Sequence, residues 1–145
     1  MAGMAARPAR SEMAHVVAIV GSRRYADPGA VWSFVDQLPA ATVVVSGGAA
    51  GVDSWAASRA RNRGLLVRTY LPAFERCGGI ADEAARRACI KRAPLERNQR
   101  IVDACDRLVA FWDGASTGTA HAIRLARKDM KPVEVHLSPG SVRVE

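Results

Sequence analysis

The apolar run Leu108-Val-Ala-Phe111 passes almost directly into Asp113-Gly114-Ala115-Ser116-Thr117-Gly118-Thr119, and this stretch decides the fold. A short apolar run bounded by turn residues is typical of a buried parallel strand. The small polar residues that follow are typical of a loop whose backbone amides, with a helix N-terminus behind them, face an anion. We therefore predict a strand, a phosphate-type loop and a helix in succession.

Two earlier segments have the same pattern. Gly21-Ser22-Arg23-Arg24 follows the run His15 to Val20, and Ser-Gly-Gly-Ala-Ala-Gly-Val-Asp at 46–53 follows the run Thr42 to Val45. In a parallel sheet all three loops leave the carboxyl ends of strands, so we expect them to meet at one crevice. The sequence therefore predicts a nucleotide site.

Further strands are predicted at 65–70 and 133–137, and helical patterns lie between the strands. Helices are expected at about 28–38, 52–60, 82–92, 95–105 and 118–128, with Pro94 separating the third from the fourth. Alternating strands and helices with right-handed crossovers predict an α/β fold. We expect a three-layer α/β/α Rossmann-like sandwich with a parallel sheet of about five strands in the order 3-2-1-4-5.

Length and charge limit the possibilities. The chain has 145 residues, enough for one core, and its net charge of +7 attracts phosphates of any kind. We expect a disordered leader at 1–14, a single nucleotide-binding domain at 15–138 and a C-terminal tail at 139–145. No apolar run approaches the ~20 residues of a membrane span, so no membrane partner is expected.

The cysteines bear on cellular location. Cys77, Cys89 and Cys105 are odd in number and lack the paired spacing of a zinc site. We therefore expect reduced thiols in a cytoplasmic protein, with no metal and no cofactor.

Four motifs occur in order along the chain. They are Gly-Ser-Arg at 21–23, Ser-Gly-Gly-Ala-x-Gly-Val-Asp at 46–53, Arg-Asn-x-x-Ile at 97–101 and Ser-x-Gly-Thr at 116–119. Together they resemble the SLOG superfamily, which includes the Smf/DprA DNA-processing proteins and the Lonely Guy phosphoribohydrolases. The resemblance covers about residues 16–135 and is greatest to the stand-alone YspA-like branch, which implies binding of a nucleotide or a nucleotide derivative.

The predicted ligand-binding residues come from these motifs and the loop before the last one. Gly21 lets the backbone approach a ligand, while Ser22 and Arg23 offer a hydroxyl and a guanidinium. Asp53 either accepts from ribose hydroxyls or bonds backbone amides near its own helix start. The full set is Gly21, Ser22, Arg23, Ser46, Gly47, Gly48, Gly51, Asp53, Arg97, Asn98, Asp113, Ser116, Thr117, Gly118 and Thr119.

Similarity to the Lonely Guy enzymes raises the question of catalysis. Those enzymes carry Glu-Arg-Lys where this chain has Glu96-Arg97-Asn98, which implies Arg97 and Glu96 as candidate catalytic residues. They continue with Pro-Gly-Gly-x-Gly-Thr-x-x-Glu, whose last Glu is needed to cleave the N-glycosidic bond. Ala122 occupies that position here. Whether the protein is an enzyme stays open.

Three functions follow. We favour binding of a nucleotide or nucleotide-derived small molecule by a sensing or processing domain; the alternatives are a nucleoside 5′-monophosphate phosphoribohydrolase and DprA-like binding of single-stranded DNA. The DNA alternative rests on basic residues between positions 86 and 100. We expect the protein to bind nucleic acid only weakly and non-specifically. Helices 82–92 and 95–105 expose more apolar surface than a sandwich edge needs, so a homo-oligomer is expected. The basic residues are Arg86, Arg87, Lys91, Arg92, Arg97 and Arg100.

Overall fold

The computed structural model describes residues 15–139 and shows a five-stranded parallel sheet in the order β3-β2-β1-β4-β5. This arrangement confirms the predicted α/β fold and strand order. The predicted leader and, apart from Pro139, the predicted tail lie outside the described residues. The elements are β1 (His15–Gly21), α1 (Pro28–Asp36), β2 (Thr42–Ser46), α2 (Val52–Asn62), β3 (Leu66–Thr69), the 3₁₀ helix η3 (Phe74–Cys77), α3 (Glu83–Ala104), β4 (Arg107–Trp112), α4 (Thr117–Lys128) and β5 (Val133–Leu137).

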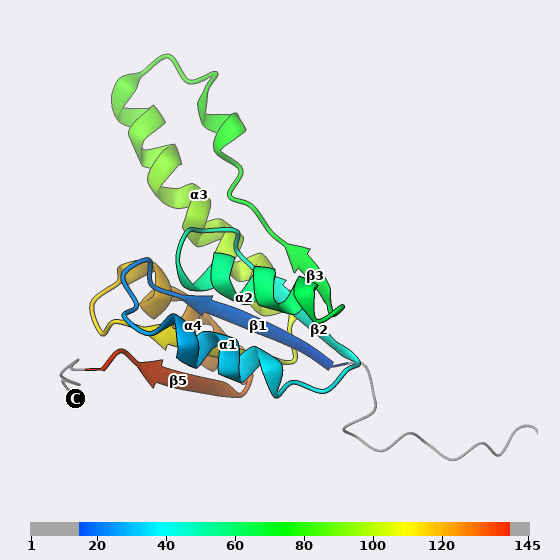
Figure 1. Cartoon of the computed structure of the whole chain (residues 1–145). Helices are drawn as coiled ribbons and strands as arrows, with labels where there is room; N and C mark the ends of the chain where they lie inside the picture. Colours follow the sequence, from blue (N-terminus) through cyan, green and yellow to red (C-terminus); the bar gives the residue numbers. More distant parts are fainter. Residues whose placement is uncertain (1–14, 140–145) are drawn as a thin grey trace, which may run out of the picture.

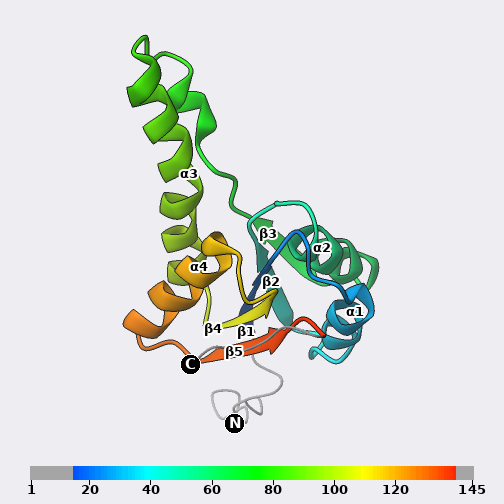
Figure 2. The same cartoon turned by 90° about the vertical axis from the view of Figure 1, so that its left-hand side faces the viewer.

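Helices cover both faces of the sheet, with α1 and α2 on one side and α3 and α4 on the other (Figure 2). Alternate side chains of β1 enter the two cores, because successive residues of a strand point to opposite faces. Val17 and Ile19 pack in the α1/α2 core, whereas Ala18 and Val20 pack in the α3/α4 core. The short apolar runs of the sequence are therefore strands buried on both faces.

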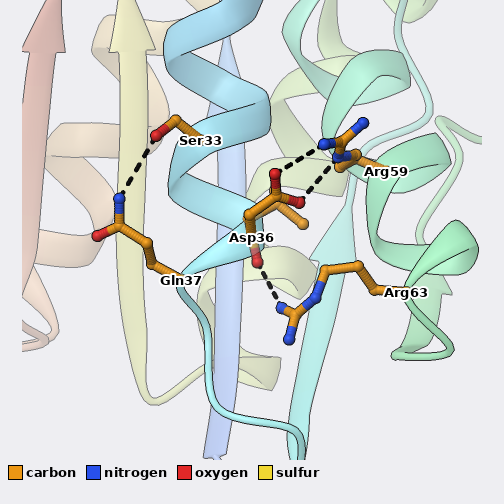
Figure 3. A network of polar contacts seen from close by, with 6 residues as sticks. Ser33, Asp36, Gln37, Arg59 and Arg63 are labelled. Atoms are coloured by element: carbon orange, nitrogen blue, oxygen red, sulfur yellow. Dashed lines mark hydrogen bonds and ion pairs between the residues drawn. The ribbon is translucent and has the colours of Figure 1, made fainter.

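Polar contacts tie α1 to α2 at the surface (Figure 3). Asp36 accepts two hydrogen bonds from Arg59, at 2.8 and 2.7 Å, and Arg63 donates to the Val35 carbonyl at 2.6 Å. Gln37 also donates to Ser33 one turn earlier in α1. These contacts fix the register of two helices whose N-terminal ends lie on the side of the predicted crevice.

Helix α3 differs from the prediction. The two helices expected at 82–92 and 95–105 form one helix of 22 residues, with Pro94 inside it. Pro94 has no N–H to give to the carbonyl of Ile90. Ile90 is exposed, so solvent can replace that donor, while Ile101 and Val102 anchor the C-terminal half in the core. Helix α3 therefore continues past Pro94, a residue type that usually ends a helix, because its C-terminal half packs in the core and the region around Ile90 is exposed to solvent.

The N-terminal half of α3 and the segment before it project beyond the sandwich, and we call residues 71–93 the arm (Figures 1 and 2). Within the described chain, neither core cluster contains an arm residue. Cys77 in η3 and Cys89 in α3 are joined by a disulfide, so the expectation of reduced thiols was wrong for this pair. Cys105 is free and buried. The pairing depends on η3 folding back onto α3, which the 12-residue separation does not reveal.

No helix in residues 15–139 is both long enough and apolar enough to cross a membrane.

Candidate functional site

A cavity of about 650 Å³ opens where the three glycine-containing loops leave the carboxyl ends of β1, β2 and β4. The fold therefore brings together residues that are far apart in sequence. The predicted residues that line it are Gly21, Arg23, Gly47, Gly48, Asp53, Arg97, Asn98, Asp113, Ser116, Gly118 and Thr119. Five other predicted residues, Ser22, Ser46, Gly51, Thr117 and Glu96, are not among the lining residues.

One wall of the cavity was not predicted. Leu71, Pro72 and Phe74 of the arm line it, together with Pro94 and Ile101 of α3. Leu71 and Phe74 are 61% and 46% exposed, so they form a partly exposed apolar surface. Their position depends on the path of the arm, and the sequence carries no motif for it.

The second loop is organised around the buried carboxylate of Asp53, which is only 4% exposed. Its Oδ2 accepts from the Ala49 amide at 3.3 Å, while the amide of Gly48 donates to the Ser46 hydroxyl at 3.2 Å. Burial raises the pKa of Asp53 to about 6, although backbone amides and Arg97 oppose the shift. The contacts present here are those of the second sequence alternative, a carboxylate that bonds backbone amides near its own helix start.

Arg97 connects α3 to the ends of two strands. Its Nη1 donates to the carbonyl of Gly47 and, at 3.3 Å, to the carbonyl of Tyr70, while its Nε donates to Asn98 Oδ1 at 3.2 Å. Burial lowers the pKa of Arg97, and the nearby Asp53 carboxylate opposes this effect. Within residues 15–139 its Nη2 has no hydrogen-bond partner, so one edge of the guanidinium is available to a ligand.

Close approach explains two of the glycines. A Cβ on Gly47 would lie 2.7 Å from Asp53 Oδ2 and 2.8 Å from Arg97 Nη1. A Cβ on Gly51, whose φ is +83°, would lie 2.8 Å from the Arg23 Cα. These glycines let the second loop, the buried Asp53 with the half-buried Arg97 near it, and the first loop pack together.

The third loop leaves its helix N-terminus open. Asp113 Oδ1 accepts from the amides of Ala115 and Ser116 at 2.9 and 2.7 Å, which fixes the turn. The amides of Thr117, Gly118 and Thr119 have no acceptor among the described residues, and Ser116 makes no side-chain cap. The first turn of a helix carries partial positive charge, so these donors can bind an anion.

The third loop is also fixed to the first loop and to α3. Ser22, which is 1% exposed, accepts from the Asp113 amide at 3.1 Å. Asn98 donates to the Gly118 carbonyl at 3.2 Å and lies 3.2 Å from His121 Nδ1. Ser22 and Asn98 therefore position the third loop from two sides, and burial lowers the pKa of His121.

Two positions bear on catalysis. Glu96 is not among the lining residues and pairs with Arg76 and, at 3.9 Å, with Arg92. Ala122 lies on the cavity wall and is 1% exposed. The carboxylate that the Lonely Guy motif carries at this place is thus missing from the wall itself, and the cavity's own carboxylates are Asp53 and Asp113.

The cavity has a positive rim. Arg23 and Arg24 line it, are exposed, and form no ion pair with any residue between 15 and 139. Arg24 was not among the predicted residues, although it directly follows the Gly-Ser-Arg motif. In the same described range, no group of His, Cys, Asp or Glu side chains is arranged to hold a metal ion.

Comparison with known proteins agrees with this architecture. Residues 15–76 match the YspA, cpYpsA-related SLOG family. DNA processing protein A (DprA) from Streptococcus pneumoniae has a similar fold, with a TM-score of 0.62 and 19% identity over 83% of this chain and 50% of its own. Comparison with curated protein sequences returns no match.

A second solved structure is similar over more of its length. It is DprA from Helicobacter pylori, described by its single-stranded DNA binding mode, with a TM-score of 0.67 and 23% identity over 89% of this chain and 68% of its own. At these identities the similarity shows the fold. The chain spans only half of the pneumococcal DprA structure.

Proposed function

We propose that the chain is a member of the SLOG superfamily, because residues 15–76 match the YspA, cpYpsA-related SLOG family, and that it binds a nucleotide or a nucleotide-derived small molecule as a YspA-like sensing or processing domain. The phosphate lies at the N-terminus of α4, and Arg23 contributes charge from the rim. The rest of the ligand extends toward the apolar wall of the arm. The Asp53–Arg97 pair supports the cavity floor beside it.

One observation carries the proposal. The three consecutive backbone amides of residues 117–119 have no hydrogen-bond acceptor in the described chain. Ser116, Gly118 and Thr119 of the same turn line the cavity. Backbone donors at a helix N-terminus suit phosphate because their direction is fixed and the helix dipole favours negative charge. The rim arginines add long-range attraction without occupying the donors.

Calorimetry of the Gly118→Val variant tests this proposal. A Cβ on Gly118 would meet no heavy atom within 4 Å, so valine enters open space at the lining instead of displacing protein. Titrations of mono-, di- and cyclic nucleotides and dinucleotides should reveal a ligand for the unmodified protein, and Gly118→Val should weaken it by about 100-fold.

The matched control is Gly79→Val, because Gly79 also has open space around its Cβ and lies in the arm away from the lining. It should leave nucleotide affinity unchanged. Gly118→Val should not destabilise the fold, since glycine is a poor helix residue. No binding across the panel, or intact affinity in Gly118→Val, would contradict the proposal.

Single-stranded DNA is the second candidate, and the described binding mode of Helicobacter pylori DprA favours it. In this chain α3 carries Arg86, Lys91 and Arg100 without ion pairs to residues 15–139, whereas Arg87 and Arg92 are paired with Glu83 and Glu96. Part of the basic interval is thus neutralised within the helix. We therefore rank the small nucleotide first.

Salt dependence separates the two candidates. Binding of single-stranded DNA to the basic face should weaken steeply with salt, with a log-log slope near −0.7 per neutralised phosphate. We expect weak DNA binding near physiological salt in mobility-shift titrations, and displacement of any bound DNA by a nucleotide. Tight binding that a nucleotide does not displace would place DNA first.

We also propose that the protein is a homo-oligomer, because Phe74, Ile90 and Leu95 are exposed on the arm and α3. Native mass spectrometry of the purified protein gives the mass of the assembly and reveals a nucleotide that co-purifies. A monomer at micromolar concentration would contradict this proposal.

A further inference from the structure

The arm contributes a cavity wall but has little core of its own. Its segment 71–81 passes from the cavity to the outer end of α3, and among the arm residues only Cys77, Cys89 and Ala93 are buried. By contrast, α3 is anchored in the sandwich through Ile101 and Val102. The position of the wall therefore depends on how segment 71–81 is attached to α3.

Three polar or covalent contacts attach this segment to α3. Arg76 forms an ion pair with Glu96, but both side chains are more than half exposed, and exposed ion pairs contribute little. Arg86 donates to the Ile80 carbonyl at 3.3 Å. The third contact is the Cys77–Cys89 disulfide, which begins three residues after Phe74 of the cavity wall.

We propose that Cys77 and Cys89 form a thiol–disulfide switch that sets the affinity of the cavity for its nucleotide. The proposal rests on the function proposed above. In the oxidised state the disulfide holds η3 on α3, so Leu71, Pro72 and Phe74 are pre-positioned as a wall. In the reduced state segment 71–81 gains conformational freedom, and binding must order it again.

The reaction is thiol–disulfide exchange with a dithiol. One thiolate of the dithiol attacks a sulfur of the Cys77–Cys89 bond and forms a mixed disulfide, and its second thiol releases the protein. The dithiol loses two electrons and two protons and becomes a disulfide, while Cys77 and Cys89 become thiols. Cys105 takes no part, because it is buried in the α3/α4 core.

Reduction of the disulfide should weaken only the contacts to the non-phosphate part of the ligand. The α4 amides belong to the sandwich and keep their position when the arm loosens, so affinity for inorganic phosphate should not change. Affinity for adenosine monophosphate should fall by about tenfold, because its non-phosphate part loses an ordered wall. This contrast distinguishes a loosened arm from general unfolding.

The test is calorimetry of the full chain with adenosine monophosphate and with inorganic phosphate, before and after equilibration with dithiothreitol. Alkylation and mass measurement confirm that Cys77 and Cys89 are reduced. The Cys77→Ser/Cys89→Ser double variant should bind like the reduced protein and ignore the reductant, whereas Cys105→Ser should respond as the unmodified protein does.

Equal affinity for adenosine monophosphate in the oxidised and reduced states would overturn the switch and leave the proposed function standing. Equal loss of affinity for phosphate would also overturn it, because the effect would then not come from the arm. Absence of binding of both ligands in both states would overturn the proposed function, and the switch with it.

Discussion

The loops after β2 and β4 look alike in sequence, since both combine glycines with small polar residues before a helix, but they differ in where their acidic residue lies. In the loop after β2, Ser46 and Asp53 accept from the amides of Gly48 and Ala49. In the loop after β4, Asp113 fixes the turn but the amides at 117–119 have no acceptor among residues 15–139. Asp53 thus places a buried carboxylate in the loop after β2, here called the filled loop, whereas Asp113 lies ahead of α4 in the loop after β4, here called the open loop.

This difference shows that a glycine-rich loop at a strand end is not by itself an anion site. An acidic residue in the first helical turn can bond the amides of the loop before its helix, as Asp53 bonds the amide of Ala49, and Arg97 then offsets the buried charge. The open loop differs in the position of its acidic residue. Asp113 precedes α4 and accepts from the amides of Ala115 and Ser116, which also precede the helix.

The largest expected effect concerns catalysis at the open loop. If the α4 N-terminus binds phosphate without a carboxylate at position 122, phosphoribohydrolase turnover of adenosine monophosphate should be absent or very slow. Loss of one group that stabilises a transition state typically costs ~10²- to 10³-fold in rate. Chromatographic assay of released base checks this. Turnover of roughly 1 s⁻¹ or more, lost in Arg97→Ala, would make the enzyme interpretation correct.

The next effect tests the filled loop through pH. Burial raises the pKa of Asp53 from 3.8 to about 6, so the folded state binds a proton that the unfolded state has released between these values. Stability from this group is therefore lost as pH rises, by about 3 kcal/mol in total. The free energy of unfolding of the unmodified protein, minus that of Asp53→Asn, should fall by about this amount between about pH 4 and pH 7.

Asp36→Asn is the matched control for this measurement. Its hydrogen bond from Arg59 lowers the pKa of Asp36, so the corresponding difference should rise with pH, the opposite sign. A difference that does not change with pH for Asp53→Asn would mean that this carboxylate is not desolvated, and the contrast between the loops would weaken.

The smallest effect concerns packing. Gly47→Ala places a methyl group 2.7 Å from Asp53 and 2.8 Å from Arg97, and overpacking of this kind costs about 1–3 kcal/mol. Gly118→Ala adds the same group where nothing lies within 4 Å, so its stability should be unchanged or higher. Chemical denaturation of the two variants compares them directly. Equal stabilities would indicate that the second loop is not closely packed around the Asp53–Arg97 pair.

The sequence predicted the sheet, its strand order and the meeting of the three loops, because these depend on local patterns and on chain connectivity. It also singled out Arg97 and Asn98, whose contacts join α3 to both the second and the third loop. These features belong to the part of the molecule where each segment's own pattern agrees with the final packing.

The sequence predicted neither the arm nor the difference between the loops after β2 and β4. Pro94 indicated a helix break, but packing of Ile101 and Val102 holds the helix together on its far side. The spacing of Cys77 and Cys89 carried no signal for a disulfide, because their approach depends on a 3₁₀ turn folding back onto α3. For Asp53 the sequence left two roles open, and its burial and its bond from the Ala49 amide depend on tertiary packing that the sequence pattern does not reveal.

The central claim, that the open amides of α4 bind the phosphate, can be tested most directly by following backbone amide chemical shifts in solution. In ¹H–¹⁵N spectra, titration with adenosine monophosphate should move the resonances of Thr117, Gly118 and Thr119 most, since a new acceptor would bond to them. The resonances of Gly48 and Ala49 should move little, because their donors are already used. Large shifts at Gly48 and Ala49, with none at Thr117 to Thr119, would contradict the account.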